Sequence, residues 1–99
     1  MATIYHITTE TAWRAAREKG QYEDPSLYTE GFIHLSEGAQ VAGVLERYYS
    51  GQKGLVKLVV DTEKLTYPLR YELAPSLNEE FPHLYGPLNL EAVVEVEGI

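Results

Sequence analysis

The chain has 99 residues, no cysteine, 15 acidic against eight basic side chains, and a net charge of −7. This length predicts one domain over residues 1–99, and the lack of cysteine excludes disulfides, thiolate metal sites and a cysteine nucleophile. The scattered basic residues argue against extended nucleic acid as a partner, and without an apolar run long enough for a membrane span or a signal-peptide pattern we expect a cytoplasmic protein.

The N-terminal part predicts a strand followed by a helix. Residues Thr3–Ile7 alternate and are rich in β-formers. A helix should then run from a threonine cap at position 8 or 9 to about Lys19, where Gly20 ends it. The polar segment Gln21–Glu30 predicts a surface loop.

A second strand and helix follow. Gly31–Leu35 predicts a short strand, and Ser36 stands where the N-cap of a helix is expected, before apolar residues at positions 41, 44, 45 and 48. Capping is the main expectation for Ser36. A ligand role is compatible with it, because a helix N-terminus offers backbone donors to an anion. Gln40, one turn along this helix, would reach the same site.

The C-terminal half predicts three more strands. Leu55–Asp61 is the most apolar of them, and Leu69–Leu73 alternates. After His83 we expect a rigid, turn-like stretch over Leu84–Pro87, and then a closing strand over Glu91–Val96. The order β-α-β-α-β-β-β predicts an α+β fold with a mostly antiparallel sheet and two helices.

The three histidines each begin the same pattern, in which an aliphatic residue and then a hydroxyl side chain follow the imidazole. In an extended strand, residues i and i+2 share a face, so each pattern should place an imidazole beside a hydroxyl. We expect the three pairs to converge on one small-molecule cleft. The pairs are His6 with Thr8, His34 with Ser36, and His83 with Tyr85.

Glu72 is the carboxylate that we single out, with Glu91 as a weaker second choice. An acidic residue in an apolar strand must face solvent or a polar cavity, and Arg70 shares its face. The catalytic candidates are therefore His34, Glu72 and His83, and the ligand-binding candidates are His6, Thr8, Ser36, Gln40, Arg70 and Tyr85.

Ordinary structural roles remain open for these residues. Glu72 could form a surface salt bridge, His34 could be a buried core histidine, and His83 could belong to a structural turn. No histidine has a second ligand at metal-binding spacing, so we predict no metal site. The glycine patterns of a serine-hydrolase elbow and of a phosphate-binding loop are also missing from the sequence.

Two longer segments carry a resemblance to a known family. Gly31–Ser36 and Phe81–Leu88, with Trp13 and Gly20 spaced before them, resemble a small bacterial family catalogued as domain of unknown function 952. The resemblance covers essentially the whole chain. It implies no established activity.

More distantly, the chain resembles the ADP-ribosyltransferase superfamily, especially its RNA 2′-phosphotransferase branch. The matching segments are Tyr5–Thr8, His34–Ser36 and Val59–Asp61. This resemblance implies a split β-sheet around a nicotinamide–ribose cleft, with His6 at a ribose hydroxyl and His34 and Ser36 along the wall.

The same resemblance implies NAD or ADP-ribose as the substrate, and we assign no further cofactor. Breaking a nicotinamide–ribose bond develops positive charge on the sugar, which a carboxylate such as Glu72 would stabilise. The alternative is a non-catalytic module that binds a small metabolite or a protein partner.

Overall fold

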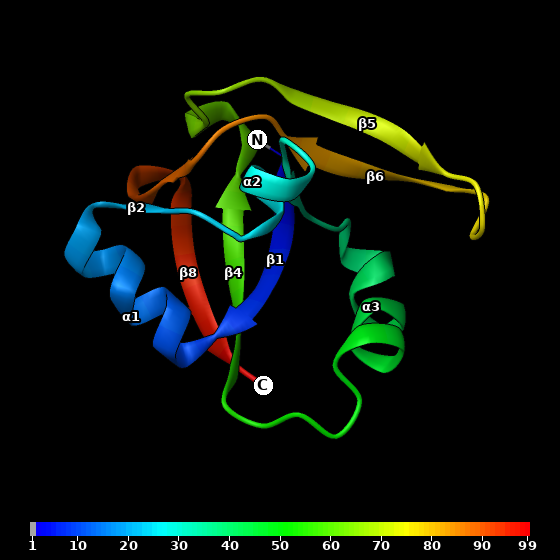
Figure 1. Ribbon diagram of the computed structural model, residues 1–99, viewed down its shortest axis with the longest axis horizontal. Coiled ribbons are helices and arrows are strands. Elements are labelled where there is room, and N and C mark those ends of the chain that lie inside the picture. Colours follow the sequence, from blue (N-terminus) through cyan, green and yellow to red (C-terminus); the bar gives the residue numbers. More distant parts are fainter. Residues whose placement is uncertain (1) are drawn as a thin grey trace.

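Strand β4 (Leu55–Asp61) lies at the centre of the fold. In the computed structural model, which describes residues 2–99, β4 pairs antiparallel with β1 (Thr3–Thr9) on one side and with β8 (Val93–Gly98) on the other (Figure 1). Six of its seven residues are buried. The uninterrupted apolar sequence of β4 is thus explained by a strand covered on both faces.

A second three-stranded sheet carries the three predicted catalytic residues His34, Glu72 and His83. β5 (Leu69–Ala74) and β6 (Glu79–Leu84) form an antiparallel hairpin, and β3 (Ile33–His34) pairs with β6, which gives the order β3-β6-β5. Two shorter strands, β2 (Gln21–Tyr22) and β7 (Leu88–Asn89), pair with each other. The sheet is therefore split into separate antiparallel pieces.

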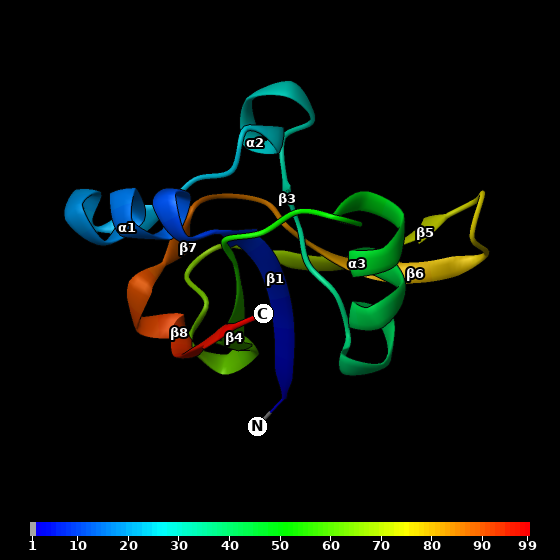
Figure 2. The same ribbon diagram turned by 90° about the horizontal axis from the view of Figure 1, so that it is seen from below.

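The helices flank the central strands. The two longer ones, α1 and α3, lie on opposite sides of the β1-β4-β8 sheet in both views (Figures 1 and 2). The helical segments are α1 (Glu10–Lys19), the one-turn helix α2 (Ser26–Thr29), α3 (Val41–Tyr48), and the 3-10 turns η1 (Gly38–Gln40), η2 (Thr62–Lys64) and η3 (Leu90–Ala92). No helix within residues 2–99 is long and apolar enough to cross a membrane.

One cluster of buried side chains joins the three sheets. It contains Ile4 of β1, Leu58 of β4, Ile33 of β3, Leu84 of β6 and Leu88 of β7, each with no exposed surface. Burying side chains of this size stabilises the fold by about 1.5–3 kcal/mol each. The cluster holds β3 and β6 against β1, and so sets the position of the predicted site.

The α+β class, the antiparallel pairing and helix α1 are confirmed. Thr9 caps α1 by accepting the backbone N–H of Ala12 at 3.0 Å, and Gly20 ends it with a left-handed φ of 101°. Of the two threonines considered, Thr9 is thus the one that caps α1.

The turn-like stretch Leu84–Pro87 begins at the last residue of β6 and bends at Tyr85 and Gly86, as expected. Two local predictions are wrong. Segment 21–30 is no simple loop, because it contains β2 and α2. Ser36 does not cap a helix. Its backbone pairs with Tyr5 in both directions at 2.8 Å, and Glu37 caps η1 through a reciprocal capping box with Gln40.

Candidate functional site

A cleft of about 570 Å³ opens where the central sheet, the β3-β6-β5 sheet and α3 meet. Residues from β1, β3, β6 and α3 line it, so the cleft depends on segments far apart in the sequence. Its polar and aromatic lining includes His6, His34 and His83, the carboxylates Asp24 and Glu30, Ser36, and the rings of Phe32, Tyr48, Tyr49 and Phe81.

His83 is oriented by a carboxylate on the neighbouring strand. Its Nδ1 lies 2.6 Å from Oε1 of Glu72, and the hydroxyl of Tyr85 donates to the same oxygen at 2.5 Å. These bonds, that of Tyr85 foremost, hold the pKa of the Glu72 carboxyl below its usual range. Because an ionised carboxylate only accepts hydrogen bonds, Nδ1 carries a proton, and in the neutral imidazole Nε2 is then the proton acceptor.

The predicted pairing of His83 with Tyr85 is therefore present in the structure. Both side chains contact one Glu72 oxygen from residues i and i+2 of the sequence. The Arg70 guanidinium lies over the Tyr85 ring, 5.4 Å from its centroid, in a cation–π contact.

Phe32 brings His34 and His83 together. Its ring stacks on His83 with centroids 4.1 Å apart and packs against His34 at 4.9 Å, and the two imidazole centroids are 5.0 Å apart. His34 and His83 are register partners across β3 and β6. His34 is half exposed and faces the Glu30 carboxylate at 3.1 Å, so a role as a buried core histidine is wrong.

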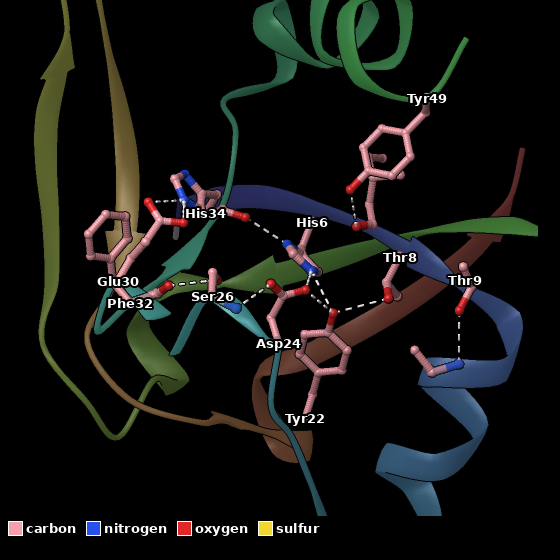
Figure 3. Close-up of polar contacts among 12 residues, drawn as sticks. His6, Thr8, Thr9, Tyr22, Asp24, Ser26, Glu30, Phe32, His34 and Tyr49 are labelled. Atoms are coloured by element: carbon pink, nitrogen blue, oxygen red, sulfur yellow. Dashed lines mark hydrogen bonds and ion pairs between the residues drawn. The ribbon is translucent and has the colours of Figure 1, made fainter. Parts of the chain in front are cut away.

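His6 lines the cleft and belongs to a cluster of largely buried polar side chains (Figure 3). Its Nδ1 donates to the backbone carbonyl of His34 at 2.6 Å, and its Nε2 lies 2.9 Å from the Tyr22 hydroxyl. The Tyr22 oxygen also lies 3.0 Å from Thr8 Oγ1 and 2.8 Å from Asp24 Oδ1. The neighbouring His6 imidazole, 3.7 Å from Asp24 Oδ1, chiefly holds the pKa of Asp24 well below its usual range.

Both ring nitrogens of His6 are thus used by the protein itself. The His6–Thr8 pair shares one partner, the Tyr22 hydroxyl, as its spacing suggests. The contact of His6 with the His34 carbonyl fixes the backbone of β3 next to the cleft. His6 consequently positions His34, and it has no free nitrogen for a ligand.

The remaining predicted residues are divided between the cleft and its surroundings. Ser36 is buried and lines the cleft. Gln40 turns toward β6, where its Nε2 donates to the carbonyl of Glu80 at 2.8 Å. The other predicted residues outside the lining are Thr8, Arg70, Glu72 and Tyr85, and Glu91 belongs to η3.

Several important residues were missed from the sequence. Phe32 precedes His34 by two positions, and Glu30 precedes it by four, so local spacing could have indicated both. Asp24 and Tyr22 had no such signal, because the segment that holds them resembles an ordinary polar loop. The position of Tyr49 in the cleft also depends on the tertiary structure. Its hydroxyl donates to the Ile7 carbonyl at 3.3 Å (Figure 3).

A family model described as "Protein of unknown function (DUF952)" matches residues 7–96. The chain belongs to this family. The crystal structure of protein CC0527 from Caulobacter crescentus is similar to it at 36% identity and a TM-score of 0.86, covering 95% of this chain and 82% of that chain. The solution NMR structure of CC0527 is similar at 35% identity and a TM-score of 0.85, covering 100% and 85%. No curated protein matches the chain.

The cleft of this DUF952 protein brings each imidazole close to one carboxylate. The distances are 3.7 Å for His6–Asp24, 3.1 Å for His34–Glu30 and 2.6 Å for His83–Glu72. Within residues 2–99 no three potential ligands are grouped closely enough to hold a metal ion. The arrangement can bind a flat ring and can exchange protons at His83.

Proposed function

We propose that this protein binds a nucleotide of the NAD or ADP-ribose class by its nicotinamide–ribose end and acts on the bond to the ribose. Its antiparallel strands, divided among separate sheets around one cleft, support an ADP-ribosyltransferase-like arrangement. The cleft volume of about 570 Å³ is in the range of small-molecule sites. Fold-level analogy alone would be weak support, so the proposal rests on the side chains.

The observation that carries the proposal is the hydrogen bond between His83 and Glu72. The Nδ1–H of His83 donates to the carboxylate at 2.6 Å, so Nε2 is the basic nitrogen of the neutral imidazole. This nitrogen would take the proton of an attacking water or hydroxyl while the bond from ribose to nicotinamide breaks. Nicotinamide leaves with the bonding electron pair as a neutral molecule. General-base catalysis of this kind contributes about 10²–10⁴-fold to a rate.

Glu72 then has a different role from direct stabilisation of the ribose cation. Its Oε1 is used by His83 and Tyr85, and its side chain is outside the cleft lining. We assign it to positioning His83. The carboxylates of Asp24 and Glu30, which do line the cleft, are in better places to stabilise positive charge on the sugar.

Two measurements on the whole protein test this function. NMR titration with NAD, ADP-ribose and nicotinamide should shift the imidazole signals of His34 and His83. Release of nicotinamide from NAD should then be abolished by His83→Gln, with an unchanged amide spectrum as the control for folding. Shifts without any turnover would instead identify a non-catalytic metabolite-binding module, and no shift at millimolar ligand would refute the proposal.

A further inference from the structure

The charges of the cleft restrict the part of a nucleotide that can enter it. No lysine or arginine is among its lining residues within the described chain. Each of its three imidazoles is already close to a carboxylate, namely Asp24, Glu30 or Glu72. Even if all three imidazoles were protonated, the three pairs would sum to zero, and with neutral imidazoles the sum is negative. A phosphate would therefore meet no net positive charge.

Backbone donors offer no substitute for basic side chains. Helical N-termini are the usual alternative for binding phosphate. At the start of α2, however, the N–H of Ser26 donates to the Asp24 carboxylate at 3.1 Å. At the start of η1, next to the lining residue Ser36, the Glu37 side chain accepts the backbone donor. The carboxylates of the chain thus occupy both places.

The walls of the cleft suit a flat cationic ring. Aromatic surface comes from Phe32 just before β3, from Tyr48 at the end of α3 and Tyr49 just after it, and from Phe81 of β6. The face of an aromatic ring attracts a cation, by about 0.5–1 kcal/mol at exposed sites and about 2 kcal/mol when water is excluded. Asp24 adds a full negative charge, because its pKa stays well below its usual range.

We infer that the cleft selects a cationic pyridinium nucleoside, of the nicotinamide riboside class, and that the phosphates of a larger nucleotide stay in solvent. This inference rests on the proposed function and narrows it. NAD would bind through its cationic nicotinamide–ribose end. ADP-ribose lacks the pyridinium ring, so the only charges that it brings to an acidic cleft are those of its anionic phosphates.

Four probes test the inference by calorimetric or NMR titration of the full chain. They are nicotinamide riboside, its reduced dihydro form, NAD and ADP-ribose. The reduced form has nearly the same shape without the positive charge, so it isolates the effect of charge. We expect nicotinamide riboside to bind about tenfold more tightly than either its reduced form or ADP-ribose, from the strength of a partly desolvated cation–aromatic contact. The affinity of NAD should be within about threefold of that of nicotinamide riboside, because phosphates that stay in solvent contribute little to the free energy of binding.

Matched variants locate the charge that matters. Glu30→Gln should weaken the binding of nicotinamide riboside about threefold, as expected for removing one partly exposed charge, and should leave the affinity for the reduced form unchanged. Glu18→Gln on α1 removes the same charge outside the cleft, so it should change neither affinity. Asp24→Asn is a second cleft variant, and its amide spectrum checks that the fold is retained.

The two levels of the proposal fail in different ways. If ADP-ribose binds as tightly as nicotinamide riboside, or if the reduced form does, the inference about charge is overturned while the proposed function stands. If none of the four probes binds at millimolar concentration, the proposed function itself is wrong.

Discussion

The Tyr22 hydroxyl gives the sharpest test of how the cleft is supported. This one oxygen lies within hydrogen-bonding distance of three groups, 2.9 Å from His6 Nε2, 3.0 Å from Thr8 Oγ1 and 2.8 Å from Asp24 Oδ1. Burial raises the pKa of Tyr22, so the hydroxyl remains a neutral donor. Tyr22→Phe removes this oxygen and leaves the rest of the ring in place.

The size of the effect depends on which partners lose contact with water. Tyr22, His6 and Thr8 are buried, so His6 Nε2 and Thr8 Oγ1 would be left without a partner, at about 1–3 kcal/mol each. Asp24 is partly exposed and can be rehydrated. We therefore expect the free energy of unfolding to fall by about 2–6 kcal/mol, a large share of the roughly 5–15 kcal/mol typical of a domain.

Urea denaturation measures this loss directly. For a slope of about 2 kcal/mol/M, the midpoint should fall by about 1–3 M. Tyr28→Phe is the matched control, because Tyr28 is 76% exposed and its hydroxyl donates to Glu23 at the surface. That variant should lose less than about 0.5 kcal/mol. If the two variants unfold at the same urea concentration, the buried cluster does not stabilise the fold as argued.

Three further predictions concern pH, packing and the core. The pKa of Asp24 is lower in the folded chain than in the unfolded one. Its contribution to the free energy of unfolding is therefore full above the unfolded pKa of about 4 and is lost as the pH falls through the folded pKa. Asp24→Asn should consequently flatten the fall of Tm below about pH 4. A Cβ at Gly86 would lie 2.3 Å from Cγ of Tyr67, so Gly86→Ala should cost about 1–3 kcal/mol in denaturant, and a double-mutant cycle with Tyr67→Ala should show that most of this cost is shared. Leu58→Ala, in the core of β4, should cost about 2–5 kcal/mol, whereas Leu73→Ala, which is 55% exposed, should change stability by less than about 0.5 kcal/mol; equal losses would contradict the assigned core.

The elements that follow from local sequence were the predictable ones. The apolar run of β4 and the cap and stop of α1 are properties of neighbouring residues, and both are present in the structure. The two-residue spacing likewise predicted that His83 and Tyr85 lie together, and they share Glu72. Glu72 itself was identified because an acidic residue in an apolar strand needs a polar partner.

The errors arise where a distant partner overrides a local preference. Serine is a typical N-cap residue, but the backbone of Ser36 forms a β-bridge with Tyr5 of β1. The N-cap residue of η1 is therefore Glu37. Tyr22 and Asp24 lie in a segment with loop-like composition. They become part of the site because β2 pairs with β7, which brings their side chains under His6.

The amino-acid sequence by itself determined the class of fold, the apolar strand β4 and two of the three predicted side-chain pairs, His6–Thr8 and His83–Tyr85, because each depends on propensity and periodicity within a few residues. Only the tertiary structure decided that His34 and His83 are register partners and that Phe32 packs against both. It also decided that His6 has both ring nitrogens occupied. Strand register is set by the burial of a common core between segments far apart in the chain, and local spacing carries no record of which strands will pair.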